Sequence, residues 1–224
     1  MERLPLPVVM SFGAGYVDAM GFVALQGLFT SHVTGNFVTL GASLALGTSG
    51  VVAKLLALPM FCLVIVLARL LAHWLAGRLP VLRTMLAIQF ALLALGAVLG
   101  VRLGPFPDGD AMPALATGMV LVAAMAIQNA VQRIHLASSP PTTIMTGTTT
   151  QIMLDLADLG LHQPPEARAV LEGRLGRMVA ALVSFGFGCA AAAAAFVFIG
   201  KWCFAIPPVL GLASLLHPRS AAPA

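Results

Sequence analysis

Long stretches without any charged side chain constrain this chain more than any other feature of its sequence. Residues 84–101, 111–132 and 178–200 contain no Asp, Glu, Lys or Arg. Each stretch is close to the roughly 20 apolar residues that an α-helix needs to cross the hydrocarbon core of a bilayer. The whole chain of 224 residues is 59% hydrophobic and 9% charged, whereas a soluble domain has roughly 25% charged residues. The sequence therefore predicts an integral membrane protein.

The apolar segments predict an all-α polytopic fold, because no strand-like alternation of apolar and polar residues appears. Two shorter apolar segments, 33–49 and 142–158, are rich in Gly and Thr, and we call them the Thr-Gly segments. We expect both to be broken or re-entrant helices. Six full transmembrane helices are expected besides them, at about 8–29, 53–74, 83–103, 113–134, 177–199 and 201–217.

The charges of the connecting loops predict the orientation. The 75–83 and 159–176 loops carry arginines and should be cytoplasmic, whereas the 104–112 loop carries two aspartates and no basic residue and should lie outside. The chain must then cross the membrane an odd number of times between the outside loop 104–112 and the cytoplasmic loop 159–176. The span 113–134 supplies one crossing, so the second Thr-Gly segment should not cross fully. The same reasoning makes the first segment re-entrant and places both termini in the cytoplasm, a step that rests on Arg3. Eight full crossings in two parallel four-helix halves are the alternative.

The two Thr-Gly segments also predict an internal repeat. Their central pairs are 112 residues apart, half the chain length, at Thr34-Gly35 and Thr146-Gly147. A polar residue precedes each pair within the preceding span, namely Asp18 in the first half and Gln128 in the second. Three spans in each half would give the halves opposite topology, an arrangement found in transporters. The expected units are a first half at 1–110, a second half at 111–217 and a flexible tail at 218–224.

Polar residues inside the spans are the candidate site. Irregular backbone survives in a membrane only where protein buries it or water reaches it. An ordinary interfacial turn capped by Thr34 is the alternative for the first break. Asp18 lies about ten residues into the first span, where a carboxylate is costly and suggests function. It could instead be a structural partner for a helix terminus or for Arg133, which could itself snorkel to the interface. The candidate solute-binding residues are Asp18, Thr34, Gly35, Asn36, Gln128, Asn129, Arg133, Thr146 and Gly147.

Motifs of other protein classes are missing from the sequence. It contains no Gly-x-Ser-x-Gly, His-Glu-x-x-His, P-loop or dinucleotide fingerprint, and its five histidines have no ligand spacing. We therefore expect no catalytic residue, no metal and no cofactor. The net charge of +4 is spread along the chain without a basic patch, so no nucleic-acid partner is expected. The isolated cysteines are read as packing residues, at positions Cys62, Cys189 and Cys203.

The stretches around Asp18, Thr34-Gly35, Gln128-Asn129 and Thr146-Gly147 together resemble the YoaK-like family of bacterial membrane proteins, a domain of unknown function. The stretches that carry the resemblance are GYVDAMGFVAL, FTSHVTGNFVTLG, MAIQNAVQR and TTIMTGTTTQIMLDLA. The resemblance covers about 11–216, and the chain departs from it at Ala126 or Ile127, where the family commonly has Gly. It implies an inner-membrane protein of several helices and no established activity, substrate or cofactor.

These observations favour a small-molecule transporter of the cell inner membrane. Its site would lie where the two Thr-Gly segments face each other, and Asp18 is a candidate for coupling transport to protons. Exposed helix N-termini after the breaks, together with Arg133, would favour an anionic or dipolar solute. Besides the lipid bilayer and this solute, a homodimer is compatible with the sequence. The alternative is a non-catalytic accessory or assembly subunit that uses the small-residue face of 178–199. A membrane-embedded enzyme is the least favoured reading.

Overall fold

Helices make up all of the regular structure in the computed structural model, which describes residues 4–161 and 164–217. The all-α prediction is therefore confirmed for the described part of the chain. The expected tail at 218–224 and Arg3 lie outside the described residues. In chain order the elements are α1 (Leu6–Ala24), α2 (Gly35–Leu46), α3 (Val51–Leu75), α4 (Val81–Leu103), α5 (Met112–His135), α6 (Met145–Leu159), α7 (Pro165–Ile199), the 3-10 helix η1 (Gly200–Ala205) and α8 (Ile206–Leu215).

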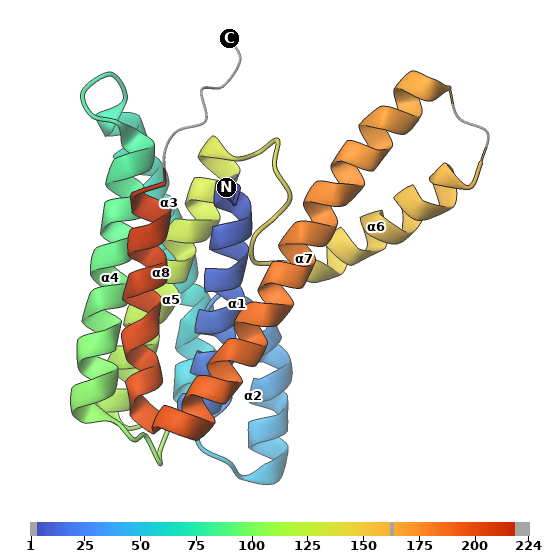
Figure 1. Cartoon of the computed structure of the whole chain (residues 1–224). Coiled ribbons are helices and arrows are strands. Elements are labelled where there is room, and N and C mark those ends of the chain that lie inside the picture. The colour runs from blue at the N-terminus through green and yellow to red at the C-terminus, as the bar shows by residue number, and fades with distance from the viewer. Residues whose placement is uncertain (1–3, 162–163, 218–224) are drawn as a thin grey trace.

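Five helical ranges are long and apolar enough to cross a membrane, which indicates a multi-pass membrane protein. Four of them are α1, α3, α4 and α5, and the fifth is the continuous range Pro165–Leu215. This last range contains α7, η1 and the 10-residue α8. Two separate spans were expected here, at 177–199 and 201–217. The chain does turn between them, at Gly200 where η1 begins, and η1 and α8 run back alongside α4 (Figure 1).

Two of the expected helix boundaries are wrong. The first span was expected to reach residue 29, but α1 ends at Ala24 because Gln26 and Gly27 adopt left-handed φ angles of 55° and 82°. The fifth span was expected to begin at 177, but α7 begins at Pro165 and is 35 residues long. The first turns of α7 carry charged side chains, so a prediction of the span from hydropathy leaves these turns out. Proline at the first helical position fits this start, since its missing N–H has no partner there in any case.

The long helices form a bundle in which the start of α1 and the end of α8 lie at the same end (Figure 1). A ring nitrogen of His217, just after α8, lies 2.7 Å from the carbonyl oxygen of Leu4, just before α1. The opposite end of the bundle gathers the connections after α2, α4 and α7. There Gly109 donates its N–H to Ser49 at 3.1 Å, and the Lys201 ammonium donates to the Gly104 carbonyl at 3.3 Å.

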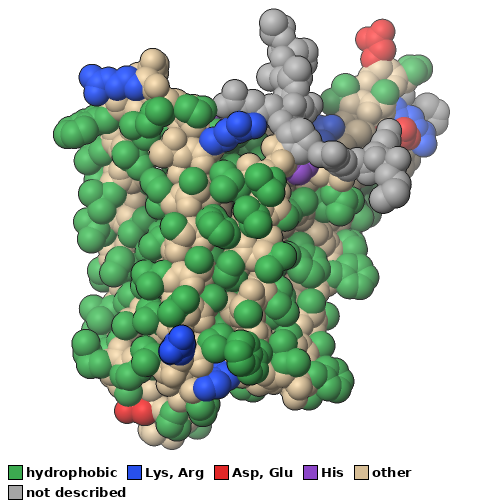
Figure 2. Space-filling view, turned by 60° about the vertical axis from the view of Figure 1, so that its left-hand side comes forward, with side chains coloured by type: hydrophobic (Ala, Val, Ile, Leu, Met, Phe, Trp, Pro, Cys, Tyr) green, Lys and Arg blue, Asp and Glu red, His purple; other side chains and the backbone are tan. Residues whose placement is uncertain are grey.

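Hydrophobic side chains cover the sides of the bundle over most of its height, and charged side chains gather toward its two ends (Figure 2). Large exposed apolar residues of this kind occur on every long helix, including Leu63, Val98 and Phe198. In water such a surface would be costly, whereas lipid tails solvate it. The distribution agrees with a bilayer surrounding the middle of the bundle.

Helices α1 and α7 cross at unusually close range, and glycine makes this possible. A Cβ atom added to Gly15 would lie 2.1 Å from the carbonyl oxygen of Phe185. A Cβ atom added to Gly188 would lie 2.1 Å from the carbonyl oxygen of Phe12. The crossing fixes the position of α1, on which the first candidate residue lies.

Candidate functional site

Asp18 anchors the chain segment that follows α1. After α1 ends, residues 25–34 turn back along the helix toward the middle of the bundle (Figure 1). The Asp18 Oδ1 atom accepts the backbone N–H groups of Thr30 at 2.7 Å and Ser31 at 2.8 Å. It also accepts the Thr30 hydroxyl at 3.3 Å. The side chain is 4% exposed, so the sequence correctly placed a buried carboxylate next to the first break.

Asn36 ties the first turn of α2 to the same returning segment. Its Oδ1 accepts the N–H of Phe29 at 2.9 Å, and its Nδ2 donates to the Phe29 carbonyl at 2.8 Å. The amide thus satisfies both backbone groups of one residue in a stretch without regular structure. Thr34 occupies the N-cap position of α2, but its side chain makes no capping hydrogen bond. The alternative of a break closed by a Thr34 cap is therefore wrong.

Gln128 and Asn129 hold a second returning segment, residues 136–144, against α5. The Thr143 hydroxyl donates to Asn129 Oδ1 at 2.7 Å. Gln128 Nε2 donates to the Thr142 hydroxyl at 3.2 Å and to the Met10 carbonyl at 2.9 Å. Two adjacent amides thus fix the segment from which α6 begins.

The two returning segments are held at matching positions. Thr30 and Ser31 stand 112 residues before Thr142 and Thr143, and Asp18 stands 111 residues before Asn129. The sequence paired Asp18 with Gln128 as its counterpart. In the contacts, Asp18 binds both residues of its segment, Thr30 and Ser31, whereas in the second half Gln128 binds Thr142 and Asn129 binds Thr143.

The remaining candidates do not gather at one point. Thr34 and Gly35 lie at the start of α2, and Thr146 and Gly147 lie in the first turn of α6. Helix α2 packs on α3 and α6 packs on α7, but the two short helices do not pack on each other within the described residues. The two short helices therefore share no direct contact, and a site where the two breaks face each other stays a prediction. Arg133 lies exposed near the end of α5, and the described residues include no ion pair between it and Asp18.

A family model described as "Protein of unknown function (DUF1275)" matches residues 6–217. The chain belongs to this family. The match covers nearly the whole chain and confirms the resemblance to the YoaK-like membrane proteins. No curated protein and no solved structure matches the chain. The family carries no assigned activity, so the function of this DUF1275 protein has to be argued from its geometry.

Two basic residues that the sequence analysis missed attach the short helices of the DUF1275 fold to their neighbours. The Lys54 ammonium, in the first turn of α3, donates to the Ser43 hydroxyl of α2 at 2.8 Å and to the Gln26 carbonyl at 2.7 Å. The Arg174 guanidinium of α7 binds the buried carboxylate of Asp155 in α6. Lys54 is only 4% exposed. A lysine near the start of a long apolar helix was the signal that could have revealed it.

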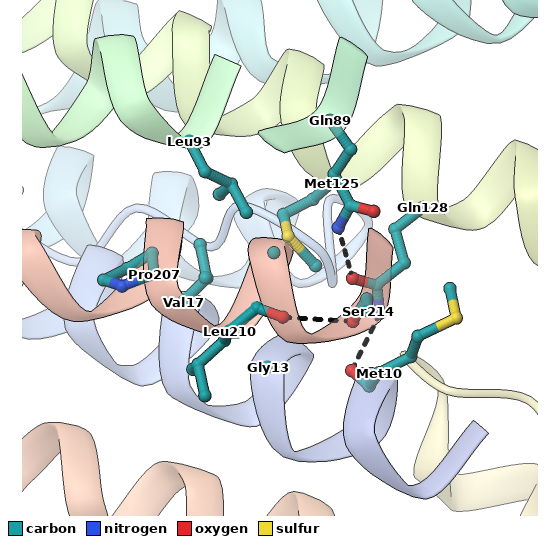
Figure 3. A pocket seen from close by; sticks show the side chains of 11 residues that line it. Met10, Gly13, Val17, Gln89, Leu93, Met125, Gln128, Pro207, Leu210 and Ser214 are labelled. Atoms are coloured by element: carbon teal, nitrogen blue, oxygen red, sulfur yellow. Dashed lines mark hydrogen bonds between the residues drawn. The ribbon is translucent and has the colours of Figure 1, made fainter. Parts of the chain in front are cut away.

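The described part of the chain contains three notable cavities. The smallest, of about 10 Å³, lies between α1, α4, α5 and α8 and has room for about one water molecule (Figure 3). Gln89 and Gln128 line it and are joined by a hydrogen bond of 2.7 Å from Gln89 Nε2 to Gln128 Oε1. A cavity of about 280 Å³ lies at the end of the bundle near Gln26 and Lys201. A cavity of about 290 Å³ lies beside Asp18.

No group of three His, Cys, Asp or Glu side chains that could hold a metal ion occurs within the described ranges. The polar residues of the site are amides, hydroxyls and one carboxylate. Such groups bind and orient a solute by hydrogen bonds and charge.

Proposed function

We propose that this protein is a small-molecule transporter of the cell inner membrane, built from two inverted halves. The supporting observation is the pattern of helix packing. If each helix of the first half (α1–α4) is exchanged with its counterpart in the second half (α5–α8, in the same order), each main pair of packed helices becomes another pair that is also packed in the structure. The pair α1–α7 becomes α5–α3, the pair α4–α5 becomes α8–α1, and α2–α3 becomes α6–α7.

The directions of the helices support an inverted rather than a parallel repeat. Helix α1 runs away from the end of the bundle where α1 begins and α8 ends, and α5 runs toward that end (Figure 1). Helix α2 starts near the middle and ends at one face of the bundle, whereas α6 starts near the middle and ends at the other. Half-helices that begin near the midplane and open to opposite faces are a feature of secondary transporters.

The buried residues of the short helices repeat with the same spacing. Asn36 and Ser43 are buried in α2, and Thr148 and Asp155 are buried in α6. Asn36 and Thr148 are 112 residues apart, and so are Ser43 and Asp155. In each half, the second of these residues binds a basic side chain from the following helix.

In this proposal the chain crosses the membrane six times. At about 2.0 Å per residue for a 3-10 helix and 1.5 Å for an α-helix, η1 and α8 together span about 27 Å. This is near the hydrocarbon thickness of about 30 Å. The face with both termini is cytoplasmic, because it carries Arg78, Arg83 and Arg168, whereas the opposite loops carry Asp108 and Asp110.

The feature that suggested the accessory-subunit alternative is partly used within the chain itself. The small residues of α7 were expected to form a docking face for a partner helix. Gly188 and Ala192 are buried, and Gly188 lies in the crossing with α1. This part of the small-residue face is occupied by the protein's own first helix.

A flux screen tests the proposal. Purified protein in proteoliposomes is assayed for uptake of small cations, zwitterions, anions and neutral metabolites, with Asp18→Asn and the loop variant Asp108→Asn as a matched pair. We expect uptake of at least one solute class by the wild type and by Asp108→Asn, and its loss in Asp18→Asn. Folded protein that moves none of these solutes would contradict a transport function.

A further inference from the structure

The cavity of about 290 Å³ beside Asp18 has a distinctive composition. It lies between α1, the returning segment 25–34 and α7. Its volume approaches the range of small-molecule sites, about 300–1,000 Å³. No Lys or Arg lines it, and the side chains that matter for binding are Asp18, Phe22, Phe29, His32, Phe185 and Cys189.

One oxygen of the Asp18 carboxylate has no hydrogen-bond partner among the described residues. Only its Oδ1 atom accepts the backbone N–H groups of the returning segment, and no hydrogen bond to Oδ2 occurs among the described residues. Asn129 holds the other returning segment with a neutral amide, and Asn36 holds Phe29 in the same way. An Asn at position 18 would provide the same acceptor. A buried charge in a membrane helix is costly, which indicates that the negative charge itself has a use.

Aromatic rings line the same cavity as the carboxylate. The Phe22 and Phe29 ring centroids are 4.9 Å apart with an interplanar angle of 40°, and the Phe29 and His32 centroids are 5.7 Å apart. Phe185 approaches from α7. The face of an aromatic ring carries negative charge density and attracts a cation placed over it.

We propose that this cavity binds the ammonium group of a small organic cation, or the ammonium end of a zwitterion, with Asp18 as its counter-ion. The phenylalanine rings surround the alkylated nitrogen, and the carboxylate selects for positive charge. The inference deepens the proposed function by naming the solute class of its site. It retains the dipolar solute expected from the sequence and replaces the anionic one, since Arg133 lies outside the cavity.

Equilibrium binding tests this assignment without relying on transport. Radiolabelled choline serves as the cationic probe and is titrated onto purified protein in lipid nanodiscs. Unlabelled 3,3-dimethylbutan-1-ol, the neutral isostere of choline, and butyrate, a small anion, are the competitors. The variants are Asp18→Asn, Phe29→Leu and the charge-matched control Asp108→Asn. Size-exclusion profiles and thermal unfolding midpoints check that each variant is folded.

We expect saturable choline binding by the wild type and by Asp108→Asn, with neither competitor displacing the probe. Asp18→Asn should bind at least about tenfold more weakly, as expected for loss of a charged partner. Phe29→Leu keeps an apolar side chain and should also weaken binding by several-fold, which covers the case in which Asp18→Asn does not fold. No binding by the wild type, unchanged affinity in Asp18→Asn, or equal displacement by the neutral isostere would each overturn the proposal. Choline binding without any flux would contradict the transporter and leave this site standing, whereas uptake of an anion without choline binding would do the reverse.

Discussion

The Arg174 guanidinium in α7 donates one hydrogen bond to each carboxylate oxygen of Asp155 in α6. Arg174 Nε lies 2.8 Å from Oδ2, and Nη2 lies 2.5 Å from Oδ1. Asp155 is fully buried, and these hydrogen bonds hold the pKa of its carboxyl below the ordinary value. Gln151 adds a third hydrogen bond to the carboxylate at 2.7 Å. The ion pair attaches the short helix α6 to the bundle.

Replacing Arg174 by Gln should therefore lower the thermal unfolding midpoint measurably, because it leaves a buried carboxylate without its cation. Arg168→Gln is the matched control, since Arg168 also pairs with a carboxylate, that of Glu172 at 2.9 Å, but both of these side chains are more than half exposed. Exposed pairs contribute little to stability. Differential scanning fluorimetry of both variants measures the difference. Equal midpoints for the two variants would mean that the buried pair does not hold α6.

Asn36→Ala should free both backbone groups of Phe29. At about 1 kcal/mol for each lost hydrogen bond, the variant should be less stable by about 2 kcal/mol. Thr150→Ala removes an exposed hydroxyl from α6 and should be nearly neutral. Denaturant unfolding in detergent gives the free energies, and hydrogen exchange at residues 28–31 gives the local effect. Unchanged exchange there in Asn36→Ala would show that the returning segment does not depend on this amide.

Gly188→Ala should disrupt the α1–α7 crossing. The added methyl group would meet the Phe12 carbonyl at 2.1 Å, and such overpacking costs about 1–3 kcal/mol or more. Gly186→Ala, two residues earlier on the same helix, has no atom within 4 Å of the new methyl group and should be neutral or slightly stabilising. Thermal unfolding of the pair compares them directly. A Gly188→Ala variant as stable as Gly186→Ala would show that the helices can separate at no cost.

Asp110 caps the start of α3 and makes stability depend on acid. Its carboxylate accepts the N–H groups of Gly50, Val51, Val52 and Ala53. Burial acts to raise the pKa of Asp110, but these four hydrogen bonds outweigh it and bring the net pKa below the ordinary value. A lowered pKa in the folded state means that the stabilisation is complete above the unfolded pKa of about 3.9 and disappears as the pH falls through the lower folded value.

Asp110→Ala should therefore lower the free energy of unfolding by about 1 kcal/mol, the usual cost of a lost N-terminal cap. The difference from the wild type should stay constant between pH 8 and pH 5 and shrink only below about pH 3.9. Unfolding curves across this range measure it. A difference that disappears near pH 6 would assign the effect to another titrating group.

The sequence was most informative at positions where a polar residue or a glycine stands in an apolar membrane segment and is energetically costly there. Asp18 in a membrane helix and the glycine and threonine of the two segments departed from the surrounding composition. The structure places the Thr-Gly pairs at the starts of α2 and α6, and Asp18 inside α1 in contact with the segment after the first break. Local chemistry alone located these breaks to within a few residues. The end of α1 was misjudged because the left-handed turn at Gln26 and Gly27 lies within an apolar stretch.

Contacts between distant residues could not be predicted in the same way. The bond between Gln89 and Gln128 and the bond between Lys54 and Ser43 depend on how the helices rotate and cross. These rotations are set by close packing at positions such as Gly15 and Gly188, which composition does not distinguish from other glycines. The cavity beside Asp18 arises from the same crossing, so its aromatic lining becomes evident only in three dimensions.

The proposal of two inverted halves is tested most directly by the side of the membrane on which α2 and α6 end. Thr48 follows α2 and Leu161 follows α6, and both are exposed. Each is changed to cysteine in a variant whose three native cysteines are replaced by alanine, and a membrane-impermeant maleimide is applied to inside-out and right-side-out vesicles. The inverted repeat predicts that Thr48→Cys labels from the periplasmic side and Leu161→Cys from the cytoplasmic side. Labelling of both cysteines from the same side would contradict it.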